Sequence, residues 1–154
     1  MTVLRHILSW GLALFLIAMF VQATIHPLPN PPAGSVKLFD LPGENIVFQT
    51  LAENSRYDIF EPAGRVFTAL IELVAALLLL LPFSRKLGAF LSFLVLSTAI
   101  ILHLSPWLGR DVPVSLDPAN TATDGGALFT LAIAMAVASI LILVVHPSRD
   151  RRYG

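Results

Sequence analysis

The stretch from Ala63 to Pro82 is almost wholly apolar and long enough to span a membrane, yet it carries one carboxylate, Glu72, near its middle. At a rise of about 1.5 Å per residue, Glu72 lies about 13.5 Å beyond Ala63, close to the midplane of a hydrocarbon layer roughly 30 Å thick. A charged group at that depth costs free energy, and such residues usually face other helices and mark a functional site. Glu72 is therefore the strongest functional clue in the sequence.

The two faces of this predicted helix differ in character. Within about 60° of Glu72 on a helical wheel lie Arg65, Thr68, Ala69, Ala75, Ala76 and Leu79, and roughly opposite lie Leu70, Val74, Leu77 and Leu81. Small residues let helices approach closely inside a membrane, so we expect Glu72 to point toward its neighbours. Burial should keep its carboxyl group neutral at pH 7 unless Arg65 or a bound ligand reaches it.

Composition extends this interpretation to the whole chain. Of 154 residues, 56% are hydrophobic and 13% are charged, and the mean hydropathy is +0.78, outside the usual balance of a soluble domain. The formal net charge of zero provides no basic field for nucleic acid. The lack of cysteine excludes thiolate, disulfide-exchange and iron–sulfur chemistry on this polypeptide.

The sequence predicts an all-α fold, an integral membrane four-helix bundle that forms one domain over residues 1–154. The predicted helices cover residues 5–23, 63–82, 87–104 and 127–146, and two long loops cover residues 24–60 and 105–126. The short connection before residue 87 makes the second and third helices antiparallel neighbours. One face of the third helix carries Gly88, Ala89, Ser92, Leu96, Ala99 and His103.

Two local interpretations stay open. The first apolar segment has a basic start and a small-residue ending, as a signal peptide does, but its apolar run approaches spanning length, so we expect it to remain as the first helix. The loop over residues 24–60 begins with several prolines, which exclude a continuing helix. Its later part could hold either a short strand pair or an interfacial helix.

The basic residues predict the orientation. Arg5, Arg85, Lys86, Arg149, Arg151 and Arg152 fall on one side of a four-crossing bundle, with Asp150 as the one acid there. The two long loops and their helix edges hold four basic and eight acidic residues. The positive-inside rule therefore predicts that both termini are cytoplasmic and both long loops face outward. We expect a multi-pass protein of the cell membrane, which is the inner membrane in a Gram-negative source.

Four polar residues are candidates for a ligand or proton site that opens outward: Glu72, Arg65, His103 and Gln22. Arg65 shares a helix face with Glu72 but lies about 10.5 Å from it along the axis, so a direct pair requires both side chains to bend. His103 and Gln22 end their helices at a depth similar to that of Arg65. The structural alternatives are a helix-packing hydrogen bond for Glu72 and an interfacial position for His103.

No complete catalytic constellation and no metal-ligand motif occurs, so we assign no catalytic residue and no metal site. Haem is a remote alternative, because the four histidines fall at two levels: His26 and His103 at one, His6 and His146 at the other. His6 and His26 would lie about 30 Å apart on a helix, at the membrane edges.

The stretch from Ile71 to Leu104, with Glu72, Arg85 and His103, resembles the DoxX-like family of small four-helix membrane proteins. Arg5, Gly11 and Phe15 resemble the first-helix pattern of that family. Met19 stands where the family usually has Gly, and Gln22 stands where it usually has Lys.

The resemblance implies a bacterial or archaeal membrane protein associated with redox systems, such as a subunit of a thiosulfate:quinone oxidoreductase or a partner in an oxidative-stress complex. The sequence itself requires no cofactor, and the resemblance allows a quinone. The expected partners are the lipid bilayer, a small amphipathic ligand and an oxidoreductase protein. The rival prediction is a non-catalytic membrane anchor or assembly partner, in which Glu72 only sets helix packing.

Overall fold

The computed structural model describes residues 2–146, which contain four long apolar helices. These are α1 (Thr2–Thr24), α3 (Arg65–Leu80), α4 (Arg85–Leu104) and α5 (Ala127–Val145). By length and composition, α1, α4, α5 and the segment Phe60–Leu80 that contains α3 could each cross a membrane. The all-α fold predicted from the sequence is confirmed, and it has the architecture of a multi-pass membrane protein.

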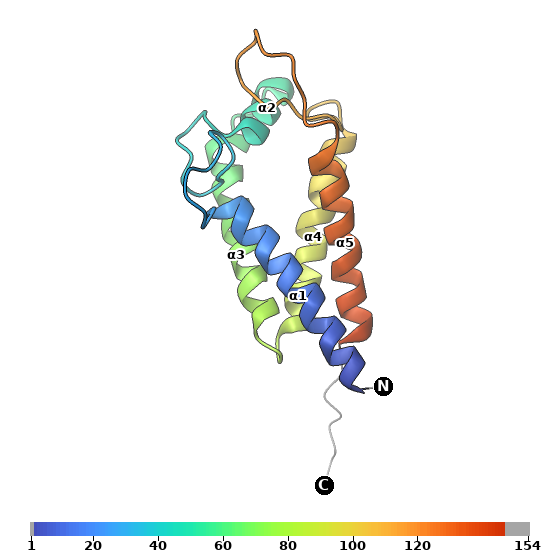
Figure 1. Cartoon of the computed structure of the whole chain (residues 1–154). Helices are drawn as coiled ribbons and strands as arrows, with labels where there is room; N and C mark the ends of the chain where they lie inside the picture. Colours follow the sequence, from blue (N-terminus) through green and yellow to red (C-terminus); the bar gives the residue numbers. More distant parts are fainter. Residues whose placement is uncertain (1, 147–154) are drawn as a thin grey trace.

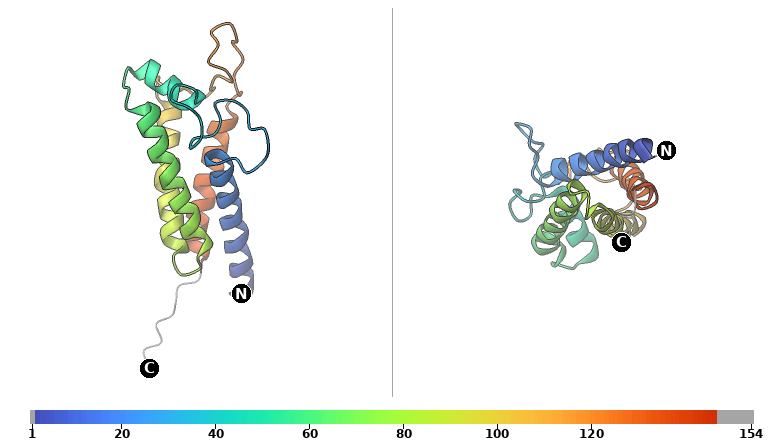
Figure 2. Two further views of the ribbon diagram at one scale, coloured as in Figure 1. Left: turned by 90° about the vertical axis from the view of Figure 1, so that its left-hand side faces the viewer. Right: turned by 90° about the horizontal axis from the view of Figure 1, so that it is seen from below.

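The four long helices form a closed arrangement in which each packs against two others. α1 lies between α3 and α5, and α4 contacts α3 and α5 on the other side; Figure 1 and the view along the bundle in Figure 2 show this order. We call the end of the bundle that carries residues 25–59 and 105–126 the loop end. The end that carries the N-terminus and residues 81–84 is the turn end (Figure 1).

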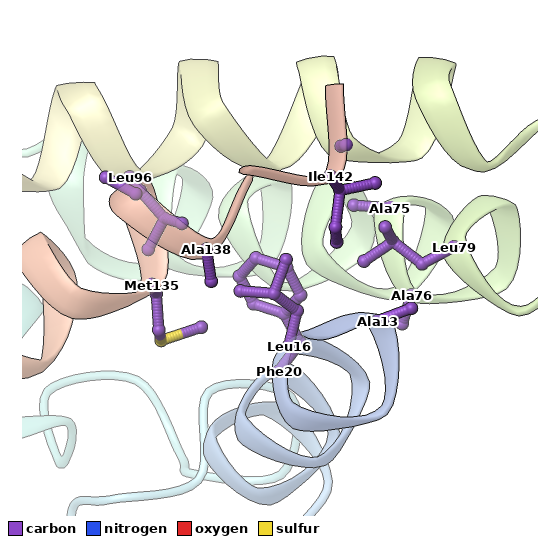
Figure 3. Close-up of a cluster of buried hydrophobic side chains, with 12 residues drawn as sticks. Ala13, Leu16, Phe20, Ala75, Ala76, Leu79, Leu96, Met135, Ala138 and Ile142 are labelled. Carbon is purple, nitrogen blue, oxygen red and sulfur yellow. The ribbon is translucent and has the colours of Figure 1, made fainter. Parts of the chain in front are cut away.

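The main core lies between the four long helices and consists mostly of small and aliphatic side chains. It includes Ala13, Leu16, Phe20, Ala75, Leu79 and Ile142 (Figure 3). The buried face of α3 is the one predicted around Glu72, whereas Leu70, Val74 and Leu77 are about half exposed, as expected of a face toward lipid. A membrane gives little hydrophobic drive between helices, so close packing of small residues has to hold the bundle together.

Gly88 shows how tightly α3 and α4 meet. A Cβ atom at this position would lie 2.6 Å from the backbone nitrogen of Leu79 and 2.9 Å from the carbonyl carbon of Leu78. Only glycine therefore permits this approach. The small-residue seam predicted on this helix is confirmed at Gly88, Ala89, Ser92, Leu96 and His103, which are buried, whereas Ala99 is half-buried.

The second predicted helix begins with an irregular turn. A π-helical turn, η1 (Phe60–Gly64), precedes α3, and Glu61 within it has extended φ and ψ angles. α3 itself ends at Leu80, and α4 starts at Arg85, two residues before the predicted start of residue 87. The connection between the two helices is correspondingly short, which makes them antiparallel neighbours as predicted.

The first long loop contains a helix, α2 (Ile46–Ser55), so a helix rather than a strand pair occupies this region. The side chain of Asn45 caps α2 by accepting a hydrogen bond from the backbone NH of Phe48, at 3.2 Å. Phe48 and Leu51 of α2 pack against Leu108 and Val112 of the second loop. This small second core closes the loop end of the bundle.

Candidate functional site

Glu72 lies on the buried face of α3 and is held by two residues from outside that helix. The Lys37 Nζ donates to both carboxylate oxygens at 2.9 Å, and the Thr24 hydroxyl donates to Oε2 at 2.8 Å. A cation therefore reaches Glu72, but it is Lys37 of the first long loop rather than Arg65. We expected a neutral Glu72 on the assumption that no cation reaches it. Lys37 removes that assumption.

Lys37 reaches the bundle because the loop folds back over the end of α1. The backbone NH groups of Lys37 and Leu38 donate to the carbonyls of Ala23 and Thr24, at 3.2 and 3.0 Å. The last carbonyls of a helix have no partner within it, and here the returning loop supplies one. Val36, beside Lys37, is 3% exposed and anchors the same segment.

Arg65, the first residue of α3, forms a second ion pair. Its Nε donates to both oxygens of Glu61 at 2.9 Å, one turn earlier in the chain, and both side chains are almost fully buried. Its Nη1 donates to the main-chain carbonyl of Lys37. Arg65 and Glu72 are thus linked through Lys37, whose carbonyl binds one and whose ammonium group binds the other.

His103 occupies the last turn of α4 and is buried. Its Nδ1 lies 2.9 Å from the carbonyl oxygen of Gly109, and its ring centroid lies 5.7 Å from that of Phe129. Gly109 has a φ of +79°, a left-handed conformation that favours glycine. The turn after α4 therefore fixes the position of the imidazole ring.

A cavity of about 340 Å³ lies inside the bundle toward the loop end. Its apolar wall includes Phe20, Phe48, Leu51, Leu96, Ala132 and Met135, and its polar residues are Lys37, Thr68, Glu72, Thr98 and His103. Cavities of this size and character are typical of small-molecule sites. The wall also includes Phe67, which is 65% exposed, so the cavity reaches the outer surface of the bundle.

Two of the four predicted site residues, Glu72 and His103, line this cavity. Arg65 stands behind it in the Glu61 pair, and Gln22 is half-buried on α1 and is not among the lining residues. Sequence reasoning missed Lys37, Thr24 and Glu61. One signal pointed to Lys37: it is the one Lys or Arg between Thr24 and Ser55. The surrounding sequence does not indicate that the loop folds back onto the bundle.

A separate polar cluster lies at the turn end around Arg85, which is fully buried. Its Nε donates to the carbonyl of Leu79 at 2.9 Å, its Nη1 donates to the Ser9 hydroxyl at 3.3 Å, and its guanidinium lies 3.7 Å from the centroid of the Trp10 ring. His146 contacts Ser9 Oγ through Nδ1 at 2.9 Å and the Pro82 carbonyl through Nε2 at 3.0 Å. The cluster joins the ends of α1, α3 and α5.

Burial lowers the pKa of His146, and the positive charges of Arg85 and Lys86, together with His6, lower it further; the hydrogen bond to the Pro82 carbonyl acts in the opposite direction. The neutral imidazole is therefore the form that fits this place. Within residues 2–146, no group of three or more His, Asp or Glu side chains is arranged to hold a metal ion.

The fold and the site together define a class: a helical bundle with four membrane-length helices and a mostly apolar internal cavity beside a buried ion pair. No family model, curated protein or solved structure matches the chain. The resemblance to DoxX-like proteins therefore depends on the residues named above.

Proposed function

We propose that this chain is a DoxX-like, redox-associated membrane subunit whose cavity holds a quinone-like or other small amphipathic molecule. The observation that carries the proposal is the cavity of about 340 Å³, which is lined by residues of α1, α2, α3, α4 and α5. Its size falls within the range of known small-molecule sites, and its few polar groups could orient a head group against apolar walls.

The exposed part of the wall supports an amphipathic rather than a fully polar ligand. Phe67 and Leu128 line the cavity and are 65% and 40% exposed. Both lie on helices apolar enough to cross a membrane. A ligand tail could leave the cavity beside these side chains and enter the lipid, while the head group stays between the helices.

The test uses a cavity-filling variant and a matched control on the same helix. Protein extracted gently from membranes should carry a bound apolar molecule by mass spectrometry, and decylubiquinone or its reduced form, decylubiquinol, should raise its thermal midpoint. Ala132→Phe fills the cavity wall and should abolish both, whereas Ala134→Phe adds the same volume on the exposed face of α5 and should abolish neither. Wild-type protein with no bound molecule and no thermal shift would overturn the proposal.

The proposed orientation places both termini in the cytoplasm and the loop end outside the cell membrane. Arg149, Arg151 and Arg152, which contribute to this prediction, lie outside the described residues. The chain has no cysteine, so single cysteines report cleanly. An impermeant maleimide should label Ser115→Cys in intact cells and Phe83→Cys only after lysis; the reverse pattern would invert the orientation.

The second candidate is a non-catalytic anchor or assembly partner of an oxidoreductase. It is favoured by one observation: both oxygens of Glu72 already accept hydrogen bonds from Lys37 and Thr24, as expected of a structural group. A Glu72→Gln variant that folds but loses redox complementation favours the ligand site. If the same variant still binds the ligand but no longer pulls down an oxidoreductase from native membranes, the result favours the anchor.

Haem binding stays a remote alternative, and the contacts of the histidines do not favour it. Both ring nitrogens of His146 are engaged, by Ser9 and by the Pro82 carbonyl. His103 and His26 each use Nδ1 on a backbone carbonyl. An absorption spectrum of the purified protein with a haem Soret band would revive this alternative.

A further inference from the structure

The hydrogen bonding of His103 determines which kind of head group the cavity can accept. The partner of its Nδ1 is the Gly109 carbonyl oxygen, at 2.9 Å, and a carbonyl can only accept. Nδ1 must therefore carry a hydrogen. In a neutral imidazole with one hydrogen on Nδ1, the other nitrogen, Nε2, is an acceptor.

This acceptor is not used by the protein. Among residues 2–146, His103 has no hydrogen-bond partner apart from the Gly109 carbonyl. Nε2 is also accessible. In the described residues, Arg85 Nη2 is the one fully buried side-chain nitrogen or oxygen without a hydrogen-bond partner, so Nε2, which has no partner either, is not fully buried. His103 lines the cavity, so the cavity is where an outside donor can meet its ring.

The other charged groups at the cavity already have partners. The two oxygens of Glu72 accept from Lys37, and Oε2 also accepts from Thr24. The two charges of this pair cancel, so the cavity has no net charge to attract an ionic ligand. Among the nitrogens that line the cavity, His103 Nε2 is the one that can accept a hydrogen bond from a head group, because the remaining hydrogen of Lys37 Nζ can only be donated.

We propose that the ligand carries a hydroxyl group that donates a hydrogen bond to His103 Nε2, as an amphipathic alcohol or phenol does. This inference depends on the proposed ligand-binding function. A carbonyl head group placed at Nε2 would set two acceptors against each other and leave both without a donor, which costs free energy in a buried site. At the position of Nε2, a quinone-like ligand is therefore favoured in its reduced, hydroxyl-bearing quinol form.

The surroundings of His103 hold the ring in the required orientation. The Gly109 carbonyl depends on a left-handed backbone conformation, with φ at +79°. The Phe129 ring lies 5.7 Å from the imidazole, at an angle of 56°. A ring fixed from two sides presents Nε2 in one direction, and a site of this kind discriminates strongly against a ligand that lacks the hydroxyl group.

The test compares 4-heptylphenol with 4-heptylanisole, its methyl ether, in which a methyl group replaces the hydroxyl hydrogen. Binding is measured by calorimetry on the full chain in phosphatidylcholine nanodiscs at about pH 8. We expect the wild type to bind the phenol about tenfold more tightly than its methyl ether, the equivalent of one hydrogen bond. His103→Phe should bind the two probes equally, and His26→Gln, outside the cavity, should keep the preference.

Each other outcome has a distinct meaning. Equal binding of both probes to the wild type would overturn the hydroxyl preference and leave the cavity function standing. Binding of neither probe, together with no ligand on the purified protein, would overturn the proposed function itself. If His103→Phe does not fold, the ¹⁵N shifts of the wild-type ring decide: a hydrogen on Nε2 rather than Nδ1 would overturn the proposal.

Discussion

The two ends of the bundle each bury an arginine, and they stabilise its positive charge in different ways. At the loop end, Arg65 forms an ion pair with the Glu61 carboxylate, and Lys37 forms another with Glu72. At the turn end, Arg85 contacts the Leu79 carbonyl, a hydroxyl and the face of an indole ring. No carboxylate within residues 2–146 pairs with it.

The position of Arg85 explains how neutral groups hold two of its three nitrogens, while Nη2 has no partner among the described residues. Leu79 lies in the last turn of α3, where unpaired carbonyls carry the negative end of the helix dipole. The guanidinium therefore caps a helix, and the indole face adds a cation–π attraction. The comparison teaches that the ion pairs belong to the end with the cavity, where a loop has to be held against the bundle, whereas the turn end needs only a cap.

The largest expected effect tests the loop end. Arg65→Met leaves the Glu61 carboxylate buried without its cation, which should lower the free energy of unfolding by about 3–5 kcal/mol. Urea or SDS unfolding in detergent measures the change. Adding Glu61→Gln should recover much of the loss, and Arg56→Met, at an exposed site, should have little effect. A loss below about 1 kcal/mol for Arg65→Met would contradict the ion-pair account.

The matching change at the turn end should cost less. Arg85→Met removes a donor from a carbonyl and a hydroxyl, which are neutral, so the expected loss is about 1–3 kcal/mol in the same assay. Arg85→Lys keeps the charge beneath Trp10 and should recover part of it. A loss equal to that of Arg65→Met would break the distinction between the two ends.

A double-mutant cycle sharpens the account of the loop end. Lys37→Met and Glu72→Gln should each destabilise the protein, and the double variant should be more stable than the sum of the two losses predicts, by about 1 kcal/mol. The coupling stays small because 19% of the Lys37 side chain is exposed and water weakens the pair. Additive effects would mean that the pair does not hold the loop.

The smallest expected effect is a pH dependence at the turn end. The pKa of His146 is lowered from its ordinary value of 6.5, chiefly by burial, so the unfolded chain binds the proton more readily than the folded one. The stabilising contribution is therefore complete above about pH 6.5 and is lost as the pH falls toward the folded pKa. His146→Asn should flatten the fall in unfolding free energy between pH 7 and pH 5. An unchanged slope would contradict the role of His146.

The features that the sequence predicted well are those that depend on local periodicity. The four long helices, the inward face around Glu72 and the small-residue seam around Gly88 all follow from residue spacing and helix geometry. The cost of a carboxylate in an apolar helix was enough to predict that Glu72 faces the bundle.

The partners of these residues were decided by the tertiary structure. The sequence placed Arg65 and Glu72 on one helix face without naming a partner for either. Arg65 bonds Glu61 of an irregular turn, and Glu72 bonds Lys37 of a loop that no local pattern placed in the bundle. The segment over residues 46–55 was compatible with strands or helix until Phe48 and Leu51 met the second loop. The cavity and the free nitrogen of His103 depend on how five helices meet, and no single segment encodes that arrangement.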